Sequence, residues 1–213
     1  MNSGSSSLIQ YPQNYYIRFK WFPPSFDRKF IICDLAGKLL GCFRLKAFKL
    51  KSEIHVFRDN SRAKELMHIK ARNLIAFSAA YEVSNPETGN ILGVWKRNGA
   101  MSLFVENWSL VKPDDPNAIF GRLEEDSVKM ALLRRYKATR WFVNLFYPSA
   151  YRVLSQNGTL LAKFRRSRNP FTPKLYVNLL GNEMVELVSA CAIIMVSAGN
   201  QAFSPTAASA KFG

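Results

Sequence analysis

One stretch near the end of the chain decides its fold, Glu183-Met-Val-Glu-Leu-Val-Ser-Ala-Cys-Ala-Ile-Ile-Met-Val-Ser-Ala198. Wound as a helix, it is apolar on every side. The two glutamates suit a helix start, and Gly181-Asn182 offers a cap. Gly199-Asn200 offers a left-handed stop. Such a helix reaches roughly 24 Å, short of the roughly 30 Å of hydrocarbon in a bilayer. A helix without a polar face must be buried either in protein or in lipid. Because this helix is too short to cross a bilayer, we expect it to be buried in protein.

The chain before this stretch reads as a series of hairpins. Each of the clearest hairpins has a strand, a tight turn with glycine, and a returning strand that ends in Lys or Arg. The clearest hairpins are Lys29–Lys46, Ser78–Arg97 and Ala150–Arg166, with turns at 34–37, 85–89 and 157–158, and a looser one covers Glu53–Arg72. Single strands are expected over Tyr15–Trp21, Met101–Glu106, Ala118–Arg122, Ala138–Tyr147 and Leu175–Leu179, while 124–135 fits a strand or a short helix.

These elements predict a mainly β protein. A long sheet must close or split to protect its edges, and an apolar helix must be surrounded. A closed antiparallel barrel of about twelve strands around the C-terminal helix meets both needs. No segment resembles an interdomain linker, so we expect one barrel domain over residues 15–200, a flexible N-terminus over 1–14 and a flexible tail over 201–213.

The composition predicts an anionic partner in a reducing compartment. Among 213 residues, 30 are basic and 15 acidic, for a net charge of +15. Nucleic acid, an acidic membrane leaflet or an acidic protein would suit this charge. The 3 cysteines are too few and scattered for a disulfide framework, and the first residues lack the features of a signal peptide. We therefore expect a cytoplasmic protein that associates peripherally with membranes.

The repeated strand-turn-Gly-strand unit, best seen in Tyr81-Glu-Val-Ser-Asn-Pro-Glu-Thr-Gly-Asn-Ile-Leu-Gly93, and the final apolar helix resemble the tubby-like barrel superfamily. This superfamily includes tubby C-terminal domains, phospholipid scramblases and the plant LURP-one-related proteins. The resemblance covers roughly Tyr15 to Asn200 and implies a twelve-stranded barrel with a central hydrophobic helix. It also implies lipid association, because tubby domains bind phosphoinositide head groups. The chain departs from scramblases in lacking their proline-rich N-terminal region and palmitoylated cysteine cluster.

The interval from Lys129 to Lys174 contains many basic residues and no Asp or Glu. Its densest point, Arg165-Arg166-Ser167-Arg168, follows the Asn157-Gly158 turn. We predict an anion-binding surface formed by Lys163, Arg165, Arg166 and Arg168, with Lys70, Arg72, Lys96 and Arg97 contributing from equivalent hairpin ends. A solvated outer face is the alternative for any one of these residues, and it is the preferred interpretation for a second basic set, Arg44, Lys46, Lys49 and Lys51.

Three functions follow from this surface. The first is non-enzymatic binding of anionic phospholipid or phosphoinositide head groups at a membrane. The second is a membrane-inserted, scramblase-like protein. The third is a nucleic-acid-binding or stress-response adaptor, since aromatic residues lie among the basic ones at Tyr136, Trp141, Tyr151 and Phe164. We expect these aromatics to face the core, as we do for Trp95 and Trp108, for which a membrane interface is the alternative.

No catalytic motif is present. The sequence has no nucleophile elbow, phosphate-binding loop or dinucleotide fingerprint, and we expect no enzyme, cofactor or small-molecule substrate. His55 and His68 have no cysteine or carboxylate at an evident metal-ligand spacing, so we expect ordinary surface or core histidines and no metal. The sequence leaves the oligomeric state open.

Overall fold

In the computed structural model, residues 11–20, 28–45, 53–73, 79–98, 106–115, 117–127, 148–169 and 172–201 are described. Several expectations fall outside these residues: most of the flexible N-terminus, the tail from 202, the strand over 138–147, and most of the segments 101–106 and 124–135. Within the described residues the chain is mainly β, with one C-terminal helix.

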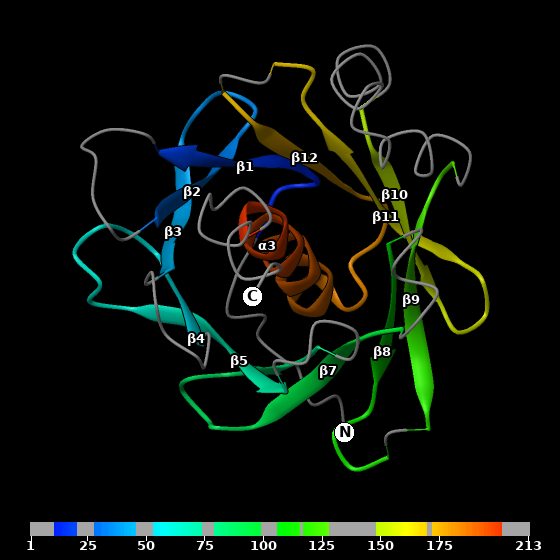
Figure 1. Cartoon of the computed structure of the whole chain (residues 1–213). Coiled ribbons are helices and arrows are strands. Elements are labelled where there is room, and N and C mark those ends of the chain that lie inside the picture. Colours follow the sequence, from blue (N-terminus) through cyan, green and yellow to red (C-terminus); the bar gives the residue numbers. More distant parts are fainter. Residues whose placement is uncertain are drawn as a thin grey trace, which may run out of the picture.

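The described residues form a closed antiparallel barrel of twelve strands (Figure 1). The strands are β1 (Asn14–Lys20), β2 (Arg28–Asp34), β3 (Leu39–Leu45), β4 (Glu53–Phe57), β5 (Glu65–Asn73), β6 (Ala80–Ser84), β7 (Ile91–Arg97), β8 (Asn107–Val111), β9 (Ile119–Glu125), β10 (Ala150–Ser155), β11 (Leu160–Arg166) and β12 (Lys174–Leu179). Each strand pairs with its neighbours in sequence, and β1 pairs with β12 to close the ring. The predicted fold class is confirmed.

The predicted turns are present and depend on glycine. Gly89 has φ +71° and donates its N–H to the Asn85 carbonyl at 2.8 Å, and Gly158 has φ +78° with a matching bond to the Ser155 carbonyl at 3.0 Å. Such positive φ values favour glycine over residues with a Cβ atom. These turns lie at one end of the barrel, the turn end, which also holds the connections after β4 and β8. The connections that follow β1, β3, β5, β7, β9 and β11 lie at the opposite end, the loop end.

The apolar stretch forms α3 (Val185–Gln201), which lies inside the ring of strands (Figure 1). It enters at the turn end after β12, and its residues from Val188 to Met195 are almost completely buried. The Met184 carbonyl accepts the first helical hydrogen bond, from the Val188 N–H at 2.9 Å, so the helix starts after Met184 rather than at the predicted cap. The predicted stop at Gly199-Asn200 is wrong, because α3 continues through both residues to Gln201.

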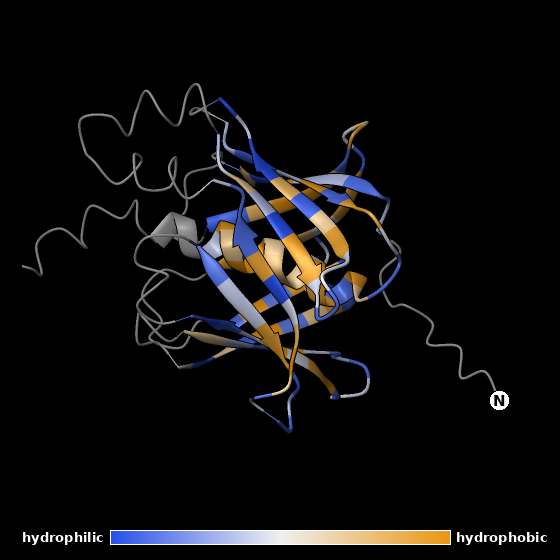
Figure 2. Ribbon diagram, turned by 90° about the vertical axis from the view of Figure 1, so that its right-hand side faces the viewer, coloured by the Kyte–Doolittle hydropathy of each residue, from blue (hydrophilic) through white to orange (hydrophobic). Residues whose placement is uncertain are grey.

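Colouring by hydropathy shows how the strands enclose α3. Hydrophobic and hydrophilic residues alternate along the strands, and the helix between them is largely hydrophobic (Figure 2). One glycine permits a close approach: a Cβ atom added to Gly93 would lie 3.1 Å from Leu187 Cδ2 and 3.2 Å from Leu110 Cδ1. No described helix is both long enough and apolar enough to span a bilayer.

The few polar groups at the helix are satisfied inside the barrel. The Tyr15 hydroxyl donates to Ser189 Oγ at 2.8 Å, and Trp95 Nε1 donates to the Leu187 carbonyl at 2.8 Å. Ser197 Oγ donates to the Ile193 carbonyl one turn earlier at 2.7 Å. Trp95 and Trp108 are both buried, which confirms that they pack within the barrel. These bonds tie α3 to strands on two sides.

Replacing Ala192 with Arg should unfold the domain. Ala192 has 0% exposure, so the new guanidinium would be buried without a partner. Burying an unpaired charge lowers the free energy of unfolding far more than an ordinary single substitution does. Circular dichroism of Ala192→Arg should show loss of the native spectrum, and Asn178→Arg, at an exposed position on β12, should keep it. A folded Ala192→Arg protein would contradict the buried position of α3.

The bond between Tyr15 and Ser189 can be measured by a double-mutant cycle. Tyr15→Phe and Ser189→Ala each remove one partner, and each should lower the free energy of unfolding by about 1 kcal/mol or more. The double variant should lose less than the sum, because the second change no longer leaves a buried group without its partner. Urea denaturation gives the four stabilities, and an additive result would show that the bond contributes nothing.

Candidate anion-binding face

Five adjacent strands, β11, β12, β1, β2 and β3, carry the most unbalanced charge in the described structure. Their only acidic residue is Asp34, at the turn end of β2. Strand alternation places seven of their basic residues on the outside of the barrel. We call this surface the basic face; it consists of Arg18, Lys20, Lys29, Arg44, Lys163, Arg165 and Lys174.

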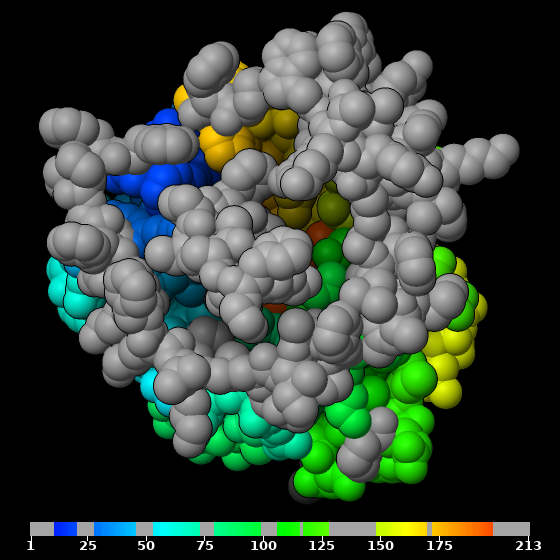
Figure 3. Space-filling model, viewed as in Figure 1, coloured from blue at the N-terminus to red at the C-terminus, as the bar shows by residue number. Residues whose placement is uncertain are grey.

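The closure of the barrel builds this face from the two ends of the chain. β1 and β12 lie side by side, blue and gold in the space-filling view (Figure 3). In the pairing register Arg18 lies opposite Lys174, while Arg165 lies opposite Tyr176, which in turn lies opposite Tyr16. Residues separated by most of the chain therefore share one surface.

Three cations stand in a row near the loop end. Lys20 lies opposite Lys29, and Lys29 lies opposite Arg44 on the next strand. Like charges directly opposite one another destabilise a sheet. Partial burial lowers the pKa of Lys29, and the charges of Arg44 and Lys20 lower it further. The row is thus a site where an anion would relieve repulsion.

An aromatic pair holds another cation of the face. Lys174 Nζ lies 4.6 Å from the centre of the Tyr16 ring, a cation–π contact. Tyr16 also packs against Tyr176 with ring centroids 6.0 Å apart. Tyr16 is buried, whereas Tyr176 is 38% exposed and so presents an amphipathic ring beside the cations. Burial raises the pKa of Tyr16, which keeps its hydroxyl neutral.

The ion pairs between described side chains lie on the other side of the barrel, on β4 to β10 and their turns. They are His55–Glu65, Lys64–Glu87, Arg72–Glu82, Arg97–Glu106, Arg122–Glu124 and Arg152–Asp126. No residue of the basic face forms an ion pair with a described carboxylate. Within the described residues, the charge of the face is therefore not neutralised by carboxylates of the chain.

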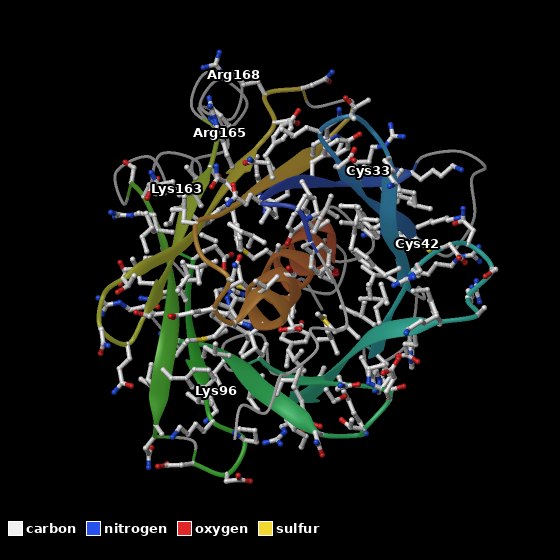
Figure 4. All side chains as sticks on the ribbon, turned by 180° about the vertical axis from the view of Figure 1, so that it is seen from behind. Cys33, Cys42, Lys96, Lys163, Arg165 and Arg168 are labelled. Carbon is white, nitrogen blue, oxygen red and sulfur yellow. The ribbon has the colours of Figure 1, made fainter. Side chains whose placement is uncertain are left out.

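The structure divides the predicted site residues into two groups. Lys163 and Arg165 lie on the basic face, and Arg168 is exposed just beyond the end of β11 (Figure 4). Arg166 belongs to the inward register, opposite buried Leu175, and its charge acts on the Tyr151 hydroxyl. Burial still raises the pKa of Tyr151 overall. Arg166 thus lies at the mouth of the barrel rather than on the face.

The second group does not join this face. Lys70 and Arg72 are on β5, and Lys96 and Arg97 are on β7, on the opposite side of the barrel from β11 (Figure 4). Arg72 Nε contacts Glu82 Oε2 at 2.6 Å, and an Arg97 guanidinium nitrogen contacts Glu106 Oε1 at 3.0 Å. These residues share the loop end with Arg165 but not its surface.

Sequence reasoning missed three residues of the face, Arg18, Lys20 and Lys29. Their outward alternation was visible, but their position beside β12 depends on barrel closure. Arg44, interpreted as plain solvation, belongs to the row of cations. Of the predicted basic interval, Arg152 is paired with Asp126, and the residues from Lys129 to Arg140 lie outside the described residues.

Comparisons with known proteins do not assign the chain to a family. No protein-family model matches it, and no characterised protein matches it in sequence. Its function must therefore be argued from the site.

Removing the Lys29 charge should stabilise the protein at neutral pH. Because the folded state lowers the pKa of Lys29, the unfolded state holds the proton more tightly, and the charge opposes folding until pH approaches the ordinary lysine value of 10.5. Lys29→Gln should raise the melting temperature at pH 7, and this gain should shrink in the alkaline range and in high salt. Lys112→Gln removes an exposed charge at the turn end and serves as the control. An equal gain in both variants would show that net charge alone matters.

Proposed function

We propose that this chain is a non-enzymatic, tubby-like barrel that binds anionic phospholipid or phosphoinositide head groups at a membrane surface through the basic face. The observation that supports this proposal is the segregation of charge on the barrel surface. The cations of the basic face, which come from five adjacent strands, form no ion pair with a described carboxylate, whereas the cations of the remaining strands are largely paired.

The size of the face suits a membrane better than a single small anion. Five strands at a spacing of about 4.8 Å cover roughly 20 Å. Cations at the two edges of the face are therefore separated by more than the Debye length of about 8 Å at physiological salt, so the face can contact more than one head group. A basic residue near an acidic leaflet contributes about 1 kcal/mol. Several such contributions give useful but salt-sensitive affinity.

Peripheral contact is favoured over insertion of α3. The helix is almost completely buried, and its contacts with Tyr15 and Trp95 would be lost if it left the barrel. Insertion would also remove from the barrel the part of its core that α3 supplies. A membrane can instead meet the outer face without any change in fold.

Nucleic acid is the weaker candidate because the two expected stacking residues that the structure describes are not accessible. Tyr151 and Phe164, expected among possible stacking residues, are 3% and 1% exposed. Base stacking needs open aromatic surfaces. On the basic face itself, Tyr176 is the large aromatic residue with substantial exposure among the described residues.

Charge reversal on the face should strongly weaken lipid binding. The triple variant Arg18→Glu, Lys163→Glu, Arg165→Glu should weaken sedimentation with phosphatidylserine-containing vesicles roughly hundredfold, at about 1 kcal/mol for each cation lost. Binding of the unmodified protein should fall with added salt and be absent with vesicles of phosphatidylcholine alone. Vesicles with phosphatidylinositol bisphosphate test whether multiple phosphates are preferred.

A matched control places the same charge change on the other side of the barrel. Lys64→Glu, Lys112→Glu, Arg122→Glu should retain binding to the acidic vesicles. Equal losses in both triple variants would assign binding to net charge and overturn the proposed face. Binding released only by detergent would favour the inserted alternative, and competition by duplex or single-stranded DNA would favour nucleic acid.

A further inference from the structure

The two histidines of the chain face each other on adjacent strands. His55 of β4 lies opposite His68 of β5, with ring centroids 4.4 Å apart and planes 12° apart. The expectation that no carboxylate accompanies them is wrong. Glu53 lies two residues before His55 on the same face of β4, and Glu65 contacts His55 from the start of β5. All four side chains lie outside the barrel, apart from the residues that define the basic face.

Three of these residues can converge on one ion. Glu53, His55 and His68 each offer a ligand atom, and these atoms lie within 4.8 Å of one another. Zinc bonds of about 2.0–2.2 Å in a tetrahedral arrangement would bring the ligand atoms to roughly 3.4 Å from each other. Because an imidazole lone pair lies in the plane of its ring, the two stacked rings would have to turn out of their parallel arrangement for both to bind one ion.

Glu65 fixes the state of the first imidazole. His55 Nδ1 lies 2.8 Å from Glu65 Oε1. An ionised carboxylate can only accept a hydrogen bond, so Nδ1 is the protonated nitrogen and Nε2 is left to bind a metal. A carboxylate that orients a metal-binding histidine in this way is a frequent feature of zinc sites.

The second imidazole, that of His68, has a buried nitrogen with incomplete hydrogen bonding. His68 Nε2 is buried and has no hydrogen-bond partner among the residues that the structure describes. A buried polar atom without a partner is costly and rare in folded proteins. An imidazole nitrogen that carries no proton has a free electron pair, and this is the group that binds a metal ion.

We propose that Glu53, His55 and His68 form a binding site for a divalent transition metal, with zinc as the best fit. Two imidazoles and one carboxylate suit zinc and its neighbours in the first transition row, whereas calcium and magnesium prefer oxygen ligands alone. Three protein ligands leave a fourth position for water or an outside ligand. The ion would connect Glu53 and His55 of β4 with His68 of β5.

Zinc titration of the full chain, purified without a polyhistidine tag, tests the site. After treatment with a chelator, calorimetry should show one zinc ion bound per chain. Because the chain has only 2 histidines, their ring nitrogen signals can be followed directly by ¹⁵N NMR, and the Nε2 signals of both should shift on binding. Unchanged imidazole signals in excess zinc would overturn the proposal.

Substitutions separate ligands from bystanders. His68→Asn and Glu53→Gln should each weaken zinc binding at least about tenfold, while Glu87→Gln, an exposed turn position with the same charge change, should bind as the unmodified protein does. Glu65→Ala should weaken binding about 10–100-fold through loss of His55 orientation, and Glu65→Gln, which keeps an acceptor, should recover most of it.

A folding control and a double histidine variant complete the test of the zinc site. Circular dichroism in the presence of chelator shows whether each variant is folded, and the NMR result on the unmodified protein stands whatever the variants do. Full zinc affinity in a folded His55→Asn, His68→Asn variant would assign the ion to other residues, such as the three cysteines, and would reject the site. Lipid binding plays no part in any of these measurements.

Discussion

Burial of a helix without a polar face is the constraint on which the whole structure depends. From Val188 to Met195 the helix α3 is surrounded on all sides. An open sheet can cover only one side of such a helix, so the strands must close around it. Two polar groups in this interior are matched by strand residues: Ser189 by Tyr15, and the Leu187 carbonyl by Trp95. The helix and the closed barrel thus require each other.

This interior leaves the outer surface and the two ends of the barrel for function. The core side chains of the strands and α3 form one continuous cluster, and Gly93 is needed for Leu187 to approach β7. The same closure brings β1 against β12, which places cations from both ends of the chain together. The requirement to bury α3 therefore also assembles the basic face.

Much of the fold could be predicted from local patterns. Glycines at positive φ mark the hairpin turns, and the apolar run marks the helix. The helix ends were less predictable, because Met184 takes φ +53° and α3 continues through Gly199-Asn200. β8 was not predicted, since Trp108 through Val111 are buried on both sides of the sheet and show no alternation.

The candidate sites were harder to predict because they depend on strand pairing. Lys163 and Arg165 stood out through local charge, but their neighbours Arg18 and Lys174 become adjacent only when the first and last strands pair. The histidine pair is similar. The spacing of Glu53 and His55 was visible as two positions on one strand face, whereas His68 joins them through the register of β4 with β5. A sequence reading that assigns outward residues and then closes the barrel would recover both.

The row formed by Lys20, Lys29 and Arg44 would link stability to the proposed anion binding. In the free protein these charges repel one another, and the lowered pKa of Lys29 records the cost. A bound anion gains its direct attraction to the row and also removes part of this repulsion. Because a ligand that binds only the folded state stabilises it, the same interaction should tighten the fold and hold the anion. On the opposite side, carboxylates such as Glu82 and Glu106 neutralise their neighbours within the chain, so an external anion has less to gain there.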